Sequence, residues 1–325
     1  MCPERHISAP VCGFAYTLAG AARARLALDS EGMRIGLHCS VSGALVNAAR
    51  RAVEVGANCF QIFSSSPRMW RAAAPPPQQA AELRRFRREN DLAPLVIHDG
   101  YLINLAAPDD EIRAKSIHAM RGELERAFLI GADYLVIHPG SARHDPVEAG
   151  MARIVESLRT AARGLRPPDG FMLLLENTAG AGATIGRTFE ELRELRDRLA
   201  PVLPFPVGYC LDTCHLFVSG YDVSTAEGLR RTVQQARDVL GLELVPVIHA
   251  NDSVGAFGSR LDRHANIGEG RIGLDGFRRI VNHPDLRRKA FVLETPVDKP
   301  GDDQRNVETL KALCRKFRTA TKKSS

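Results

Sequence analysis

The sequence predicts a single-domain (β/α)₈ barrel, in which eight parallel strands alternate with helices around one core. Two observations predict it. From residue 33 onward, short β-rich runs alternate with amphipathic helical segments, and this alternation indicates parallel strands joined by right-handed crossovers. The 325 residues, 44% of them hydrophobic, also suit one large α/β barrel, and no change of composition marks a second domain. An open doubly wound sheet is the structural alternative.

The predicted strands are short apolar runs that end in a polar residue. They cover residues 33–38, 59–64, 95–98, 134–138, 171–176, 207–212, 244–249 and 290–294. Between them, apolar residues recur at spacings of three and four, with Arg and Glu on the opposite face, which is typical of helices that cover a sheet. Gly often follows these segments, as expected of a helix C-cap.

The barrel is predicted to span residues 33–317. Residues 1–32 have some features of a signal peptide, but Gly, Tyr and Thr dilute the apolar centre and Glu4 interrupts its charged start. We therefore expect a disordered extension, with translation starting at Met33, where the first strand begins. Residues 318–325 are predicted to be a solvated basic tail.

Charge and cysteine content place only broad limits on function. The formal net charge of +6 mildly favours a polyanionic partner. The seven cysteines are scattered and odd in number, which argues against a disulfide framework and for a reducing cytoplasm. No apolar run approaches the roughly 18–20 residues of a membrane helix, so we expect no membrane association.

The residues that end the predicted strands carry the strongest functional signal. In order they are His38, Ser64, His98, His138, Glu176, Asp212, His249 and Glu294. In a parallel barrel these ends lie on one rim, where active sites form. One such His is ordinarily structural, but seven metal-capable side chains buried together would be costly without cations. We therefore predict a cluster of divalent metals.

Further candidate ligands lie close to these strand ends. Asp262 and His264 are two residues apart, so on extended backbone both side chains point the same way. The stretch "LDTCHLFVSGYD" adds Cys214 and His215 to Asp212. Imidazole and carboxylate ligands suit zinc, manganese or iron.

The stretch "GEGRIG" at residues 268–273 has the spacing of a dinucleotide-binding motif. No strand directly precedes it and no acidic partner follows at the required distance. We therefore predict a tight loop near the metals and no nucleotide cofactor.

Six motifs, in order along the chain, resemble those of the endonuclease IV family of trinuclear-zinc apurinic/apyrimidinic endonucleases. They are "HDGYLINLAAP", "VIHPGS", "LLENTAGAG", "CLDTCHLFVSGYD", "IHANDS…FGSRLDRHANIGEG" and "LET". They cover nearly the whole chain from residue 33 to about residue 315. The resemblance implies a TIM barrel of the xylose-isomerase-like group that acts on double-stranded DNA with abasic sites in base-excision repair. The sequence itself gives no signal for the oligomeric state, and we expect a monomer.

The resemblance also implies three zinc ions per chain, held by nine residues. His98, His138 and Glu176 would hold the first ion. Glu176 would bridge to the second ion, which is completed by Asp212, His249 and Glu294. The third and most exposed ion would bind His215, Asp262 and His264.

Two neighbouring residues have supporting roles in this interpretation. Cys214 is expected to be a packing residue that faces away from the metals. His38 is expected to lie near the metals and to orient a ligand or a phosphate.

By the same resemblance, the reaction is hydrolysis of the phosphodiester bond 5′ to the abasic site, giving a 3′-hydroxyl and a 5′-deoxyribose phosphate. Three divalent ions would outweigh the four carboxylates among the ligands, leaving positive charge for a hydroxide and a phosphodiester. A hydroxide bridging the first two ions would attack phosphorus, and the third ion would stabilise the leaving oxygen. Glu176, as the bridging ligand, is the predicted catalytic residue.

Recognition of the missing base is expected to involve side chains that enter the base stack. By resemblance these are Arg68, Tyr101 and Leu102, in the loops after the second and third strands. Trp70, the only tryptophan, is expected to anchor its loop. The stretch "SSSPRMW" is less polar than the family's version of this loop, and Cys39 stands where a valine is expected.

Two other functions compete with this interpretation. A sugar isomerase or epimerase could use the ring of Glu176, Asp212, His249 and Glu294 with one or two metals, but the remaining five ligands would be surplus. A metal-stabilised DNA-binding protein without catalysis is the second, and the complete ligand set argues against it.

Overall fold

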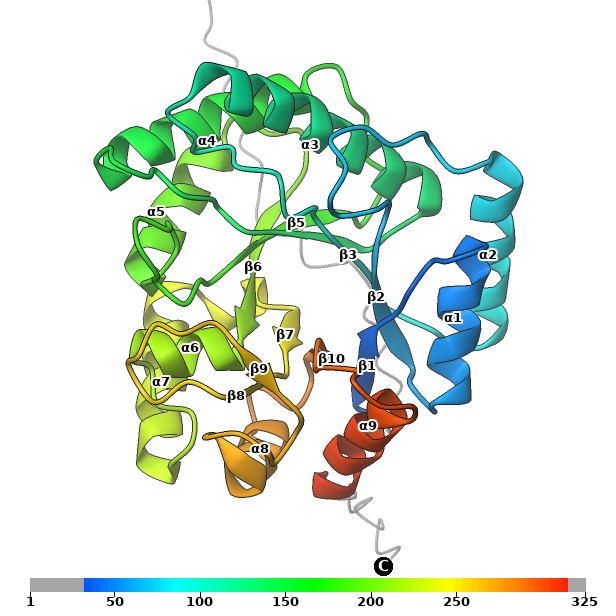
Figure 1. Cartoon of the computed structure of the whole chain (residues 1–325), viewed down its shortest axis with the longest axis vertical. Helices are drawn as coiled ribbons and strands as arrows, with labels where there is room; N and C mark the ends of the chain where they lie inside the picture. The colour runs from blue at the N-terminus through cyan, green and yellow to red at the C-terminus, as the bar shows by residue number, and fades with distance from the viewer. Residues whose placement is uncertain (1–31, 315–325) are drawn as a thin grey trace, which may run out of the picture.

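Eight strands form a closed barrel in the computed structural model, which describes residues 32–314 (Figure 1). The strands are β1 (Arg34–His38), β2 (Cys59–Phe63), β3 (Leu95–His98), β4 (Tyr134–Ile137), β5 (Met172–Glu176), β6 (Val207–Asp212), β7 (Val247–His249) and β10 (Ala290–Leu293). Their order is β1-β10-β7-β6-β5-β4-β3-β2, and every pair is parallel. The predicted barrel is confirmed, because β1 pairs with both β2 and β10 and so closes the sheet.

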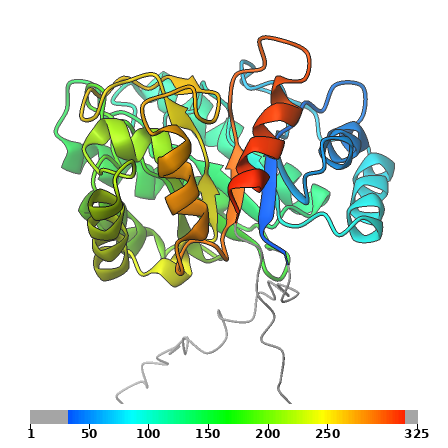
Figure 2. The ribbon, with the colours of Figure 1, turned by 90° about the horizontal axis from the view of Figure 1, so that it is seen from below.

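Helices surround this barrel. They are α1 (Leu45–Glu54), α2 (Pro77–Glu89), α3 (Asp110–Ile130), α4 (Val147–Ala162), α5 (Phe189–Leu199), α7 (Ala226–Val239), α8 (Gly273–Asn282) and α9 (Asp302–Leu313). In the side view of Figure 2, α8 (orange) and α9 (red) pack next to each other against the strands. Three of these helices start at a side-chain N-cap, in which Asp109, Thr188 or Thr225 accepts a hydrogen bond from the amide three residues on.

Additional short elements lie where strands β6 and β7 end. Helix α6 (Thr213–Ser219) follows β6 directly, with Asp212 as its N-cap. The loop after β7 contains an antiparallel pair, β8 (Asp252–Ser253) and β9 (His264–Ala265). These elements build up the rim on one side of the barrel mouth.

Alternation along the strands explains why polar residues gather at one end of the interior. Successive side chains of a strand face opposite sides. One alternating set packs against the helices, and the other fills the inside of the barrel with small and β-branched side chains such as Cys59, Val136 and Val247. Two residues beyond these apolar positions, the inward series continues into polar side chains such as His138 and His249. The site is thus the last layer of the barrel interior.

The strand limits differ from the prediction at β7. Residues 244–249 were predicted, but the strand begins at Val247. A 3₁₀ turn, η2 (Leu242–Leu244), precedes it, and Pro246 has no amide hydrogen to donate to a neighbouring strand.

Ser64 differs from the other predicted strand ends because it does not join the polar layer of the interior. It lies just beyond β2 and makes hydrogen bonds to a buried ion pair on α3. Its hydroxyl donates to Glu123 and accepts from Arg126. The predicted tail at 318–325 and, except for residue 32, the predicted N-terminal extension lie outside the described residues. Within residues 32–314, no helix combines the length and apolar character needed to cross a membrane.

Candidate metal centre

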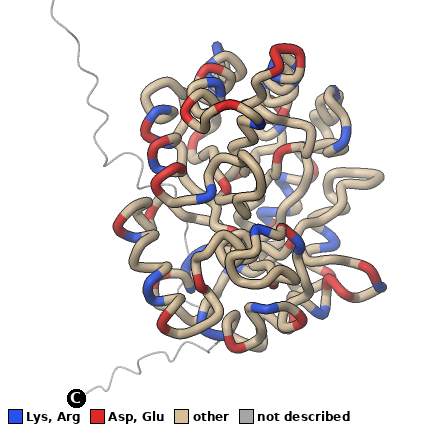
Figure 3. The backbone as a smooth tube through the Cα atoms, turned by 60° about the vertical axis from the view of Figure 1, so that its left-hand side comes forward, with Lys and Arg blue, Asp and Glu red and all other residues tan. Residues whose placement is uncertain are grey.

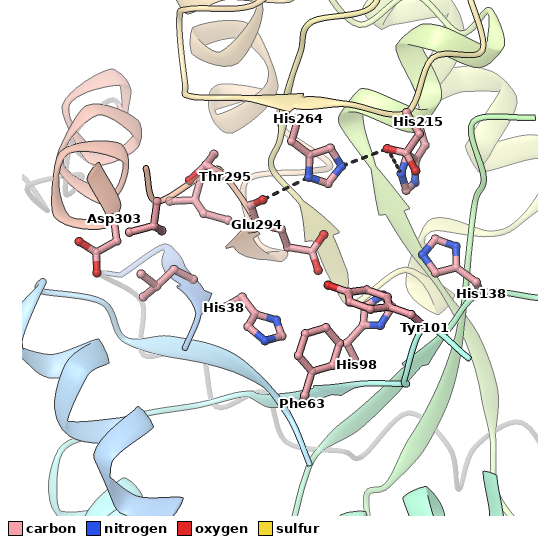
Figure 4. Close-up of a pocket in the computed structure, with 14 residues that line it drawn as sticks. His38, Phe63, His98, Tyr101, His138, His215, His264, Glu294, Thr295 and Asp303 are labelled. Atoms are coloured by element: carbon pink, nitrogen blue, oxygen red, sulfur yellow. Dashed lines mark hydrogen bonds and ion pairs between the residues drawn. The ribbon is translucent and has the colours of Figure 1, made fainter. Parts of the chain in front are cut away.

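The nine side chains named as ligands lie together at the carboxyl ends of the barrel strands. Figure 4 shows several of them pointing toward a common space, a cavity of about 370 Å³. Their ligand atoms form three groups, each with all atoms within 4.8 Å of one another: His98, His138 and Glu176; Glu176, Asp212, His249 and Glu294; and His215, Asp262 and His264. The first two groups share Glu176.

Glu176 occupies the centre of the cluster and is fully buried. Its Oε2 lies 3.1 Å from His98 Nε2 and 3.6 Å from His138 Nε2. Its Oε1 lies 3.0 Å from His249 Nδ1 and 3.3 Å from His215 Nδ1. Burial alone would raise the pKa of Glu176, but its electrostatic interactions with the imidazoles of His249 and His138 hold it well below its usual value. The carboxylate is therefore an anion surrounded by imidazoles.

The third group is assembled by the short elements of the rim. His215 comes from α6, and His264 from β9. Asp262 Oδ1 lies 3.1 Å from His215 Nε2 and 3.6 Å from His264 Nε2. Both Nε2 atoms are buried and make no hydrogen bond. Two such nitrogens beside one carboxylate fit a cation, and the Asp262 side chain, 51% exposed, leaves this position open to solvent.

Backbone carbonyls orient three of the imidazoles through their Nδ1 atoms. A metal-ligating His ordinarily donates its other ring N–H in this way, which fixes its tautomer. The pairs are His98 with Asp99 O at 2.9 Å, His215 with Asn177 O at 2.9 Å and His264 with Glu294 O at 3.2 Å. In each, Nε2 is left to face the cavity.

The pKa values of the ionisable groups differ widely across the cluster. Burial lowers the pKa of His138 to about 4. Burial also acts to lower that of His98, but the hydrogen bond and charge of Glu176 raise it to about 9. Burial raises the pKa of Asp212. Such a cluster holds several charges away from water, and divalent cations would replace the protons that its imidazoles otherwise carry.

Cys214 lies closer to the cluster than expected. Its Sγ is within 4.8 Å of ligand atoms of Asp212 and His264, so the expectation that it faces away is wrong. Burial raises the pKa of the thiol to about 12, and the ligating form of cysteine is the thiolate. The side chain is fully buried in the hydrophobic core, as a packing residue would be.

Two buried asparagines, which were not predicted, hold the candidate ligands in place, one through carboxylate oxygens and the other through the backbone of Asp212. Asn251 Nδ2 donates to Asp212 Oδ2 at 2.5 Å and to Glu294 Oε2 at 3.2 Å, while its Oδ1 accepts from the Glu294 amide. Asn177 Oδ1 accepts from the Asp212 amide at 2.7 Å. The only sequence signal for either was its position in the motifs "LLENTAGAG" and "IHANDS", one or two residues after a strand end.

The glycine-rich segment 268–273 is a tight loop close to the third group. It wraps around a carboxylate of the same chain, that of the fully buried Asp252. Asp252 accepts hydrogen bonds from the amides of Gly268, Gly270, Ile272 and Gly273. A Cβ on Gly270 would lie 2.4 Å from Asp252 Oδ1, which explains the glycine.

The three side chains expected to enter the base stack lie in the rim loops after β2 and β3. Arg68 is exposed and Leu102 is half-buried. Tyr101 is 66% exposed and packs edge-on against Phe63, with ring centroids 5.2 Å apart. It lines both the metal cavity and a neighbouring cavity of about 480 Å³, where Leu102 and the half-buried Trp70 also lie.

Comparison with known proteins identifies the family. The model of the xylose isomerase-like TIM barrel family matches residues 49–316. A probable endonuclease 4 of Solibacter usitatus is 58% identical over 281 residues, which cover 86% of this chain and 97% of the relative. The chain belongs to the endonuclease IV family. Both the family resemblance and the prediction of a hydrolase of the endonuclease class are confirmed.

Solved structures agree with this assignment. The crystal structure of endonuclease IV from Thermus thermophilus matches with a TM-score of 0.75 and 40% identity, covering 86% of this chain and 98% of that one. The 3-keto-D-glucoside 4-epimerase YcjR of E. coli matches with a TM-score of 0.58 but only 17% identity, covering 87% and 99%. At this low identity, the epimerase shows only that the two proteins share a barrel fold, and it gives no information on the reaction of this endonuclease IV family member.

Proposed function

We propose that this endonuclease IV family member hydrolyses the phosphodiester bond 5′ to an abasic site in duplex DNA, leaving a 3′-hydroxyl and a 5′-deoxyribose phosphate, as a monomer in base-excision repair. The observation that carries the proposal is the convergence of three groups of ligand atoms on one cavity, with Glu176 shared between two of them. A sugar isomerase ring needs only the group of four.

The nine side chains would hold three zinc ions, divided as the three groups divide. Imidazole and carboxylate donors suit zinc. The Nε2 atoms of His215 and His264 make no hydrogen bond and both lie near Asp262, which supports a cation between them. Zinc ions bound by these nine side chains would act as Lewis acids and lower the pKa of a coordinated water toward about 7. Glu176 would keep the first two positions adjacent, because each of its oxygens faces a different pair of imidazoles.

The exposed apolar side chains of the rim support a nucleic-acid substrate with a missing base. Among the described residues, six of the nine large hydrophobic side chains with high exposure lie in loops that follow barrel strands: Met69, Tyr101, Val254, Phe257, Leu261 and Val297. Apolar and aromatic side chains stack on bases and fill gaps in a duplex. Arg68, Tyr101 and Leu102 are proposed to enter the stack at the lesion.

The test is incubation of the purified protein with a duplex that carries a tetrahydrofuran abasic analogue, which cannot undergo β-elimination. We expect a single nick 5′ to the analogue, with a 3′-hydroxyl that a polymerase extends. Metal analysis of the same sample should give three zinc ions per chain. Binding without incision in the presence of zinc would favour a non-catalytic DNA-binding protein, and one manganese ion with no nicking would favour an isomerase.

A further inference from the structure

Gln61 is a fully buried polar residue inside the barrel mouth that none of the assigned roles uses. It lies on β2, faces inward, and contacts three of the polar side chains around it. Its Nε2 lies 2.6 Å from Glu294 Oε1 and 3.1 Å from His38 Nδ1, and its Oε1 lies 2.8 Å from His249 Nε2. A single amide thus connects two of the four side chains in the central metal group.

The surroundings allow this amide only one orientation. Both oxygens of the Glu294 carboxylate face amide nitrogens, since Oε1 lies 2.6 Å from Gln61 Nε2 and Oε2 lies 3.2 Å from Asn251 Nδ2, and a carboxylate ligand only accepts hydrogen bonds. The amide nitrogen must therefore face Glu294. A flipped amide would place Gln61 Oε1 against the carboxylate, oxygen to oxygen.

This orientation determines the tautomer of His249. With its nitrogen on Glu294, Gln61 presents Oε1 to His249, and an amide oxygen only accepts. His249 Nε2 must therefore carry a proton. Its Nδ1 is then the atom available to a metal, and it lies 3.0 Å from Glu176 Oε1 and 3.3 Å from Glu294 Oε2.

His249 differs in this respect from the other oriented imidazoles of the site. Those of His98, His215 and His264 are fixed by backbone carbonyls at Nδ1 and face the cavity through Nε2. His249 faces the carboxylates through Nδ1, and its opposite nitrogen points to a side chain. A side-chain partner, unlike a carbonyl, can be removed by substitution.

We infer that Gln61 is a positioning residue that fixes the ring and tautomer of His249, donates a hydrogen bond to Glu294 Oε1, and thereby sets the affinity of the central metal position. His38 completes the arrangement, because its Nδ1 accepts the second amide hydrogen. The inference rests on the proposed zinc centre. Removing such a partner of a ligand typically lowers metal affinity about 10–100-fold.

The first experiment compares zinc binding by the wild-type protein and Gln61→Met, which keeps the length of the side chain but has no amide. Competition with a chromogenic chelator should show one of three zinc ions bound about 10–100-fold more weakly in the variant. Val96→Ala is the matched control, since Val96 lies in the barrel interior on the neighbouring strand and makes no polar contact. It should unfold at a lower temperature yet retain the wild-type zinc affinity.

A second measurement needs no variant. In zinc-loaded wild-type protein with ¹⁵N-labelled histidine, two-bond ¹H–¹⁵N spectra should show the His249 proton on Nε2, while His98, His215 and His264 carry theirs on Nδ1. A proton on His249 Nδ1, or unchanged zinc affinity in folded Gln61→Met, would overturn the role of Gln61 and leave the zinc centre intact. A wild-type protein that takes up no zinc would overturn both.

Discussion

Glu176 connects two of the three ligand groups, so its replacement tests the centre directly. Glu176→Gln preserves the shape of the side chain but removes the negative charge that faces four imidazoles. We expect incision to fall by more than about 100-fold, because losing a ligand should cost at least as much as losing its supporting partner. The measurement is incision of the abasic duplex together with zinc content and circular dichroism.

Glu190→Gln, on the exposed first turn of α5, is the control for this substitution. It should match the wild-type protein in all three measurements. Near-normal turnover of a folded Glu176→Gln protein would contradict the bridging role.

Tyr101 and Leu102 test recognition of the lesion separately from the metals. Tyr101 is expected to contribute about 1–3 kcal/mol by stacking at the gap, and Leu102 about 1.5–3 kcal/mol by burying its apolar side chain there. Tyr101→Ala and Leu102→Ala should therefore lower kcat/KM by roughly 5- to 150-fold. Zinc content should not change, because neither residue is a proposed ligand.

Val202→Ala is the matched control. It is also an exposed hydrophobic side chain, but it precedes β6 and so lies at the opposite end of the barrel. A variant of Tyr101 or Leu102 with wild-type kcat/KM would remove that residue from the recognition step.

The candidate ligands could be predicted at the level of single residues, whereas their supporting amides could not. A strand that ends in His or Glu predicts a polar layer at the barrel mouth. Side chains alternate along the strand, so every second residue faces the interior, up to the last residue at the rim. Gln61 and Asn251 give no such signal. A side-chain amide can both donate and accept hydrogen bonds, so it fits many polar surroundings and its position in the sequence does not predict its partners. Only the three-dimensional contacts show which groups it connects.

Among the elements, the β8–β9 pair and its glycine-rich neighbour depend on one buried carboxylate. Asp252 receives four amides of the 268–273 loop and pairs through its backbone with Ala265, next to His264. Asp252→Asn places an NH₂ group where several amides need an acceptor, which should cost about 1–3 kcal/mol. We therefore expect lower stability in denaturant titrations and selective loss of the third zinc ion.

Asp275→Asn provides the comparison for this change. Asp275 lies nearby on α8, but its side chain is 74% exposed and pairs with Arg278 at the surface. Such pairs contribute about 0–1 kcal/mol, so this variant should keep three zinc ions. Equal zinc loss from both variants would show that the effect is not specific to the loop.

The eight barrel strands and the helices between them could be predicted because each is long enough to show its own periodicity. The short rim elements could not. Helix α6 has seven residues and the two strands of the β8–β9 pair have two each, too few for any periodic pattern. They depend on contacts distant in the sequence, such as the bond from Arg260 N to Val218 O. This is why Asp262 and His264 were recognised from their spacing while the hairpin that carries His264 was not.

The charge of the whole molecule says less about its partner than the composition suggested. The chain has a formal charge of +6, but Figure 3 shows basic and acidic residues interspersed over the outer helices. Many of them pair across helices, as Arg51 does with Asp303 and Arg198 with Glu148. Exposed hydrophobic side chains are instead concentrated at the rim, around the cluster of candidate metal ligands.

The metal cluster should stabilise the entire barrel. Its ligands come from β3, β5, β6, β7, from residues just after β4 and β10, and from the α6 and β9 segments, so cations would connect most of the circumference. A ligand that binds only the folded state stabilises it by about 2.7 kcal/mol at a concentration 100 times its Kd. Removal of zinc by a strong chelator should therefore lower Tm by several degrees, and calorimetry with and without added zinc measures this.

The rate of zinc loss should separate the ligand groups in the same experiment. Glu176 and His249 are fully buried, whereas Asp262 is half exposed, so a modest EDTA concentration should remove the third ion first and the other two only slowly. Restoring zinc should restore Tm if the barrel stayed folded. Glu176→Gln should show a smaller zinc-dependent change in Tm, since it weakens the two inner positions together. A wild-type Tm independent of zinc, in protein that binds three ions, would mean that the cluster contributes chemistry without holding the barrel together.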